Sequence, residues 1–177
     1  MSDIAQSFIQ VYTGNGKGKT SAAMGAALRA ACHGLPVCFI QFLKGRHDQS
    51  SVSCIPNITY LCFGKNHETA GWYSPLQAGQ TSPEEIVSGW LQAEKCIHSG
   101  TYRLVVLDEI NVALNFGYLT VQQVQKTLIN RPQSVEIICT GRGAPQELLD
   151  MADIATEMKE IHHMYQQGIP ARPGFDF

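Results

Sequence analysis

The chain has 177 residues, of which 44% are hydrophobic and 16% charged, and its formal net charge is −2. These values are ordinary for a soluble globular protein, so we expect one domain over residues 1–177. Without a basic excess, nucleic acid is not expected as the main partner. The sequence shows neither an apolar run of the roughly 18 residues that a membrane span needs nor the basic-then-apolar start of a signal peptide, so we expect a cytoplasmic protein.

The first part of the chain alternates predicted strands and helices. An apolar run at 8–13 predicts a strand, and the Ala-rich residues 19–34 predict a helix with Gly34 as its C-cap. Residues 35–45 are nearly all apolar, which is typical of a strand buried on both faces, and residues 58–63 predict another strand.

A long polar stretch without clear periodicity follows at residues 64–82. Loops of this length in compact domains are usually functional or disordered. The adjacent aromatic residues Trp72 and Tyr73 argue against simple disorder, so we expect a functional loop.

The alternation resumes in the rest of the chain. Ser82 as N-cap and Pro83 in the first turn predict a helix that runs to about His98, and residues 102–110 predict a buried strand ending in two acids. The later predicted elements are a helix over 119–130 with Thr120 as its N-cap, a strand over 134–141, a helix over 144–152 and a possible edge strand over 155–163. This order predicts the α/β class, with three layers in which helices cover both faces of a mainly parallel sheet.

A glycine-dense loop, TGNGKGKTS, joins the first predicted strand to the first helix. Such a loop points backbone N–H groups at an anion, and the positive end of the helix dipole adds to the attraction. We expect Lys19 to reach nucleotide phosphates and the Thr20 hydroxyl to contact Mg²⁺. The candidate nucleotide-binding residues of this loop are Thr13, Gly14, Asn15, Gly16, Lys17, Gly18, Lys19, Thr20 and Ser21.

The strand predicted at 102–110 has the form of the acid-bearing strand that partners a phosphate loop. We expect Asp108 or Glu109 to orient Mg²⁺, directly or through water. Lys44 and Arg142 stand just past two other predicted strands, at the ends where ligands gather in open α/β sheets. They are therefore candidates for additional contacts to the ligand.

The glycine spacing departs from the usual pattern G-x-x-x-x-G-K-[ST]. That pattern requires Gly at the position of Thr13, and here the first glycine, Gly14, comes one place late. The cradle can therefore hold a triphosphate differently from a kinase or a simple ATPase. The residues alone predict an ATP or GTP site with Mg²⁺ and leave the acceptor open.

Several segments, taken in order, resemble one family. They are TGNGKGKTSAA, QFLKG, LDEINVAL, NRP, TGRGAPQELLDMAD, TEM and the terminal ARPGFDF. Together they resemble the ATP:corrinoid adenosyltransferases of the cob(I)yrinic acid a,c-diamide type, from the first predicted strand to the last residue.

This resemblance implies a P-loop NTPase fold of RecA-like architecture, usually a homodimer. It implies transfer of the 5′-deoxyadenosyl group of ATP to the cobalt of a reduced corrinoid, with release of triphosphate, in adenosylcobalamin biosynthesis or salvage. In the family the triphosphate lies in the reverse sense to that of common P-loop enzymes. The implied catalytic residues are Lys19 and Glu109, which would stabilise the leaving triphosphate, and a reductase or a flavodoxin-type protein is a possible electron donor.

The long loop departs from the family. Members commonly carry Gly-Phe-x-Trp followed by Glu-Thr there, and these aromatics are thought to displace the lower ligand of the corrinoid. Here Lys65 and His67 stand where Phe and Trp are expected, and Phe63, Trp72 and Tyr73 lie close enough in sequence to substitute. The candidate corrinoid contacts are Phe63, Lys65, His67 and Trp72. Lys44 and Arg142 are candidates for either substrate.

Two other functions compete with adenosyl transfer. The adjacent acids Asp108 and Glu109 would also suit a P-loop ATPase or phosphotransferase, in which Glu109 orients an attacking water. The absence of the usual loop aromatics would also suit a carrier or regulator, which binds ATP and a corrinoid without turnover. The sequence leaves open whether the acceptor is cobalamin or a precursor.

Overall fold

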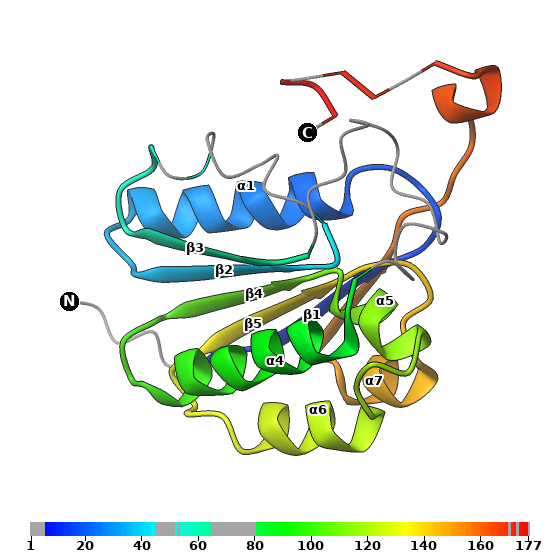
Figure 1. Ribbon diagram of the computed structural model, residues 1–177. Helices are drawn as coiled ribbons and strands as arrows, with labels where there is room; N and C mark the ends of the chain where they lie inside the picture. Colours follow the sequence, from blue (N-terminus) through cyan, green and yellow to red (C-terminus); the bar gives the residue numbers. More distant parts are fainter. Residues whose placement is uncertain are drawn as a thin grey trace.

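Six parallel strands form one sheet in the order β3-β2-β4-β5-β1-β6 (Figure 1). The computed structural model describes residues 6–44, 52, 54–64, 81–169, 171–172 and 174–176. The strands are β1 (Ile9–Thr13), β2 (Val37–Phe42), β3 (Ile58–Phe63), β4 (Leu104–Asp108), β5 (Glu136–Thr140) and β6 (Ile154–Glu157). The helices are α1 (Lys19–Cys32), α4 (Pro83–His98), α5 (Ile110–Asn115), α6 (Val121–Ile129) and α7 (Gln146–Met151), with a 3-10 helix η2 (Met164–Gln167).

The sheet is covered on both faces, as the alternation predicts. In Figure 1, α1 lies on one face, and α4, α5, α6 and α7 lie on the other. On the first face, the small side chains of α1 pack with Phe39, Val106 and Ile138 of the sheet. On the second face, Trp90 of α4 and Leu128 of α6 belong to the larger core. The three-layer α/β prediction is therefore confirmed, and the fold is consistent with a P-loop NTPase-like architecture.

Local sequence signals mark several element ends correctly. The side chain of Ser82 accepts a hydrogen bond from the N–H of Glu85 at the start of α4, and that of Thr120 accepts one from Gln123 at the start of α6. Gly34 follows the last turn of α1 with φ 76°, a conformation that favours glycine. All residues of β2 are buried, as expected for the continuous apolar run.

Two elements differ from the sequence prediction. The strand predicted over 102–110 ends at Asp108, because Glu109 adopts a left-handed conformation (φ 64°) and the short helix α5 begins at Ile110. The edge strand predicted over 155–163 is β6, which is shorter, pairs in parallel with β1 and is exposed along its whole length. An exposed edge strand has no need of alternating apolar residues, which explains its weak pattern.

None of the six cysteines forms a disulfide, and Cys38, Cys96 and Cys139 are buried. Cys32 and Cys54 are exposed, and Cys62 is half-buried. Among the described residues, no helix combines the length and apolar character that a membrane span requires.

Candidate functional site

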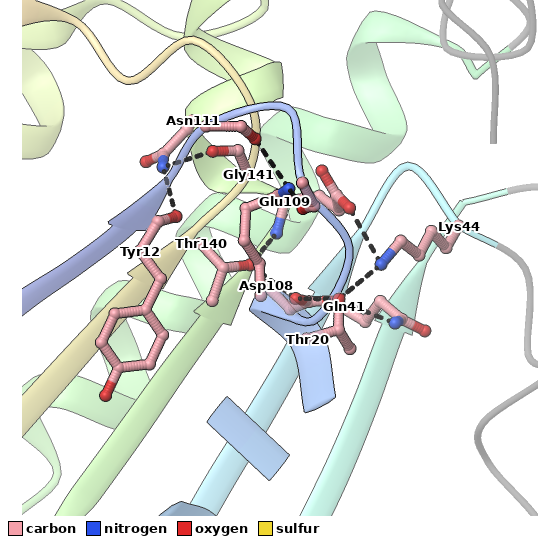
Figure 2. Close-up of polar contacts among 12 residues, drawn as sticks. Tyr12, Thr20, Gln41, Lys44, Asp108, Glu109, Asn111, Thr140 and Gly141 are labelled. Carbon is pink, nitrogen blue, oxygen red and sulfur yellow. Dashed lines mark hydrogen bonds and ion pairs between the residues drawn. The ribbon is translucent and has the colours of Figure 1, made fainter. Parts of the chain in front are cut away.

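The polar residues of the predicted site converge where the central strands end. Because the strands are parallel, the glycine loop after β1, Lys44 after β2 and Glu109 after β4 lie at the same edge of the sheet. Figure 2 shows the side chains of Thr20, Lys44 and Glu109 directed toward one another, together with residues of β2 and β5.

Two positions of the loop require glycine, because the loop packs closely against the chain after β6. A Cβ on Gly14 would lie 2.5 Å from the carbonyl oxygen of Met158, and one on Gly16 would lie 2.7 Å from the same atom. The N–H of Gly16 donates a hydrogen bond of 2.7 Å to that oxygen. The unusual glycine density therefore has a packing cause, because the segment after β6 lies directly against the loop.

The N-terminus of α1 opens onto this loop. Its N-cap, Gly18, has φ 115° and supplies no side-chain cap to the first N–H groups of the helix. Lys19 is only 8% exposed, and its ammonium donates to the carbonyl oxygens of Gly14 (2.7 Å) and Gly16 (2.6 Å). Burial lowers the pKa of Lys19, while the charge of Glu109 opposes this shift. Uncapped helix N–H groups and a buried ammonium together favour an anion.

The buried carboxylate of Asp108 is the centre of the polar network (Figure 2). Its Oδ1 accepts hydrogen bonds from Thr140 (2.5 Å) and Thr20 (2.9 Å). Its Oδ2 accepts from Gln41 (2.9 Å) and Lys44 (3.2 Å). Burial acts to raise the pKa of Asp108, but the charge of Lys44 and the hydrogen bonds outweigh it and hold that pKa below its ordinary value. The carboxylate is therefore ionised at neutral pH.

The ammonium of Lys44 lies among the three residues predicted to hold Mg²⁺. Its contacts are Thr20 Oγ1 at 2.8 Å, Asp108 Oδ2 at 3.2 Å and Glu109 Oε1 at 2.9 Å. Two carboxylates and a hydroxyl are hard oxygen donors of the kind that Mg²⁺ prefers. The cluster already surrounds one cation, so these residues fit a magnesium ion. Over the ranges that the structure describes, no cluster of three or more His, Cys, Asp or Glu side chains offers another metal site.

Three supporting residues were missed in the sequence. Gln41 is fully buried and links Asp108 to the hydroxyl of Tyr60, which donates to Gln41 Oε1 (2.5 Å). The hydroxyl of Thr140 also accepts a hydrogen bond from the N–H of Glu109 (3.1 Å). The sequence did contain two signals for them, which are a single Gln inside an apolar strand and a Thr at the end of another strand.

Asn111 is the third missed residue. Its amide nitrogen donates to the carbonyl oxygens of Gly141 (3.1 Å) and Tyr12 (3.4 Å), which ties α5 to the ends of β1 and β5. Among the residues that the structure describes, its buried Oδ1 has no hydrogen-bond partner. The LDEIN segment therefore contributes a bracing amide as well as two carboxylates.

Other predicted residues lie around this centre. The hydroxyl of Thr13 accepts from the N–H of Ala144 (3.1 Å), and the charge of Arg142 acts on Lys19. Asn15 and Ser21 are exposed.

Two further predicted residues make other contacts. Lys17 turns to the C-terminal segment, where it forms an ion pair with Asp176. Phe63 stacks on Phe42 and lies against Gly89 of α4, so its ring packs at the margin of the core. The candidate corrinoid contacts Lys65, His67 and Trp72 lie outside the described residues.

Comparisons with known proteins match the chain to one family. The family described as ATP:corrinoid adenosyltransferase BtuR/CobO/CobP matches residues 5–177. An uncharacterized protein of Nostoc sp. is 40% identical over 88% of this chain, and the match spans 44% of the Nostoc protein.

Proteins named corrinoid adenosyltransferase also align along most of the chain. The one from Pseudomonas aeruginosa is 33% identical, over 94% of this chain and 82% of its own. The one from Escherichia coli K12 is 31% identical, over 96% of this chain and 85% of its own. With a family match that runs from the first strand to the C-terminal segment, the chain belongs to the ATP:corrinoid adenosyltransferase family.

Proposed function

We propose that the protein transfers the 5′-deoxyadenosyl group of ATP to the cobalt of a reduced corrinoid and releases triphosphate. The observation that carries this proposal is the pairing of an uncapped α1 N-terminus, which suits the triphosphate, with the oxygen cluster around Lys44, which suits its metal. Family membership supplies the corrinoid as the acceptor.

The triphosphate is the leaving group, and the site offers positive charge for it. The N–H groups of the glycine loop and of α1 bind its oxygens, and Lys19 exchanges its two loop carbonyl contacts for phosphate oxygens. Arg142, whose charge reaches Lys19, adds to the same positive field. Charge that develops on the departing oxygen is therefore stabilised by groups already in place.

Magnesium would be held by Thr20 and Glu109, with Asp108 orienting Thr20 from its buried position. When bound, Mg²⁺ neutralises phosphate charge. A bound ion would take the place of the Lys44 ammonium at the three oxygens, and Lys44 would then pair with a phosphate. The predicted roles of Lys44 as a phosphate contact and of the acids as metal ligands are thus compatible.

The reaction needs no protein nucleophile. A Co(I) corrinoid is itself strongly nucleophilic, so its cobalt attacks the 5′ carbon of the ribose. The carbon–cobalt bond forms with the cobalt electron pair, and the carbon–oxygen bond breaks with its electrons going to the triphosphate. The reversed triphosphate of the family presents that carbon, rather than the γ-phosphorus, to the acceptor.

The corrinoid side of the site is proposed from the sequence. Phe63, Lys65, His67 and Trp72 are the proposed contacts, a homodimer is the proposed assembly and a reductase or a flavodoxin-type protein is the proposed electron donor. His67→Trp, which restores one aromatic of the family pattern, is expected to raise turnover that starts from Co(II) corrinoid. Unchanged turnover from both Co(II) and Co(I) would move the corrinoid-facing residues elsewhere.

An ATPase or phosphotransferase is the second candidate, because Glu109 lies beside Asp108 and both carboxylates reach the cation position. Its product would be ADP rather than triphosphate. The deciding experiment mixes the protein anaerobically with MgATP and chemically reduced cob(I)alamin, follows the visible spectrum and analyses the phosphates. Loss of the Co(I) band with triphosphate release supports transfer, and ADP formation without transfer supports the ATPase.

A further inference from the structure

The glycine loop is tied to the C-terminal segment through Lys17. The ammonium of Lys17 lies 3.0 Å from Asp176 Oδ1 and donates to the carbonyl oxygen of Phe175 at 3.1 Å. In Figure 1 the C-terminal segment, in red, lies on the same upper side of the molecule as the blue loop that leads into α1. Two segments from opposite ends of the chain therefore meet beside the proposed phosphate site.

Asp176 is built into this contact. Its side chain is only 3% exposed, whereas that of Lys17 is 44% exposed. Its Oδ2 accepts hydrogen bonds from the N–H (2.9 Å) and the Nε (3.2 Å) of Arg172. The backbone N–H groups of Phe175 and Asp176 both donate to the carbonyl oxygen of Arg172, which closes the segment into a turn.

The charges of this turn favour an ionised carboxylate. Burial alone would raise the pKa of Asp176, but the hydrogen bonds from Lys17 and Arg172 lower it to about 2. Arg172 also lies over the ring of Phe175, with 5.1 Å from Cζ to the ring centre. We call this set, Lys17 with Arg172, Phe175 and Asp176, the tail clasp.

The tail clasp contacts the glycine loop, whose backbone adopts conformations that favour glycine. Gly14 and Gly18 have positive φ values, and the contact of Gly16 with Met158 holds the loop from one side. The side chain of Lys17 extends to the C-terminal segment, where its ammonium contacts Asp176 and Phe175. Fixing that side chain fixes the backbone N–H groups on either side of it, which are the proposed phosphate ligands.

We propose that Asp176 is a positioning residue for the nucleotide: through Lys17 it holds the glycine loop in the arrangement that receives the triphosphate. This inference rests on the proposed function for the identity of the ligand. Preorganisation of this kind strengthens binding, because the loop no longer has to be ordered when the ligand arrives. The effect belongs to nucleotide affinity rather than to the rate of the chemical step.

The test is a double-mutant cycle on MgATP binding, measured by titration calorimetry without any corrinoid. Asp176→Asn is expected to weaken MgATP binding by about fivefold, and less at high salt, because the pair is partly exposed. In the Lys17→Gln background the same change is expected to have almost no further effect. Asp176→Glu, which keeps the charge, is expected to recover part of the affinity.

Hydrogen exchange supplies a readout without nucleotide. Amides over residues 14–20 are expected to exchange faster in Asp176→Asn than in the parent chain. Asp150→Asn is the matched control, because Asp150 is an exposed carboxylate on α7 that accepts a hydrogen bond from Gln146, and it is expected to leave both measurements unchanged.

Each contrary result has a distinct meaning. Unchanged affinity or exchange in Asp176→Asn would overturn the positioning role, and tighter MgATP binding would instead make Asp176 a competitor of the phosphates. An equal loss in the Lys17→Gln background would show that Asp176 does not act through Lys17. Failure of the parent chain itself to bind MgATP would overturn the proposed function as well.

Discussion

Replacing Lys44 by Met should destabilise the protein and make its stability depend on Mg²⁺. The change keeps much of the side-chain stem and removes the ammonium that lies 3.2 Å from Asp108 and 2.9 Å from Glu109. Asp108 is fully buried, and removing the partner of a buried charge costs about 3–5 kcal/mol.

Two features of the site reduce this cost. Asp108 keeps its hydrogen bonds from Thr140, Thr20 and Gln41, and the side chain of Lys44 is 22% exposed, so water already screens the pair. We therefore expect a loss of about 2 kcal/mol in the free energy of unfolding. For a chain of this size, that loss lowers Tm by about 4–8 °C.

The assay is thermal unfolding in EDTA and in MgCl₂. The proposed Mg²⁺ would bind the oxygens that Lys44→Met leaves without an ammonium, so it should raise the Tm of the variant more than that of the parent chain. Lys126→Met, on the exposed face of α6, is the control and should change little. A variant as stable as the parent in EDTA, or an equal Mg²⁺ increment in both proteins, would refute the shared cation position.

Four further outcomes are expected. Lys19→Ala should abolish MgATP binding in calorimetry, and full binding would mean that the loop is not the site. Gly89→Ala should lower the free energy of unfolding by about 1–3 kcal/mol, because the new Cβ would lie 2.7 Å from the ring of Phe63. Gly25→Ala, whose new Cβ would meet no described atom within 4 Å, should instead stabilise α1 by about 0.5–1 kcal/mol in urea unfolding. The folded pKa of Asp108 lies below its ordinary 3.8, so its contribution to stability is complete at neutral pH. Urea stability should begin to fall as the pH drops below that ordinary value and should continue to fall until the folded carboxylate is itself protonated.

Much of the fold follows from local pattern. The continuous apolar run around Val37–Phe42 predicts a doubly covered strand, and Ser82 and Thr120 mark helix starts through hydrogen bonds to nearby backbone. The glycine loop and the acids at 108 and 109 were also found from local spacing. Such features depend on neighbours in the sequence, so the sequence alone reveals them.

The features that were missed depend on distant partners. The residues around Gly14 do not indicate that Met158 packs against it. Nor do the residues around Lys44 indicate that its ammonium contacts oxygens from α1 and β4. The left-handed conformation of Glu109 ends a strand that its apolar residues would have extended. Contacts of this kind become predictable only when the strand order is known.

That strand order also constrains how the protein folds. β1 contains the start of the glycine loop, yet both of its neighbours come from the far end of the chain: Ile9 pairs with Ile137 of β5, and Gln10 pairs with Ile154 of β6. Pairings so distant in sequence have a high loop-closure entropy and form slowly. A growing chain on the ribosome therefore exposes its glycine loop long before β5 and β6 can pair with β1, so the proposed nucleotide site forms only after both of these strands have been made.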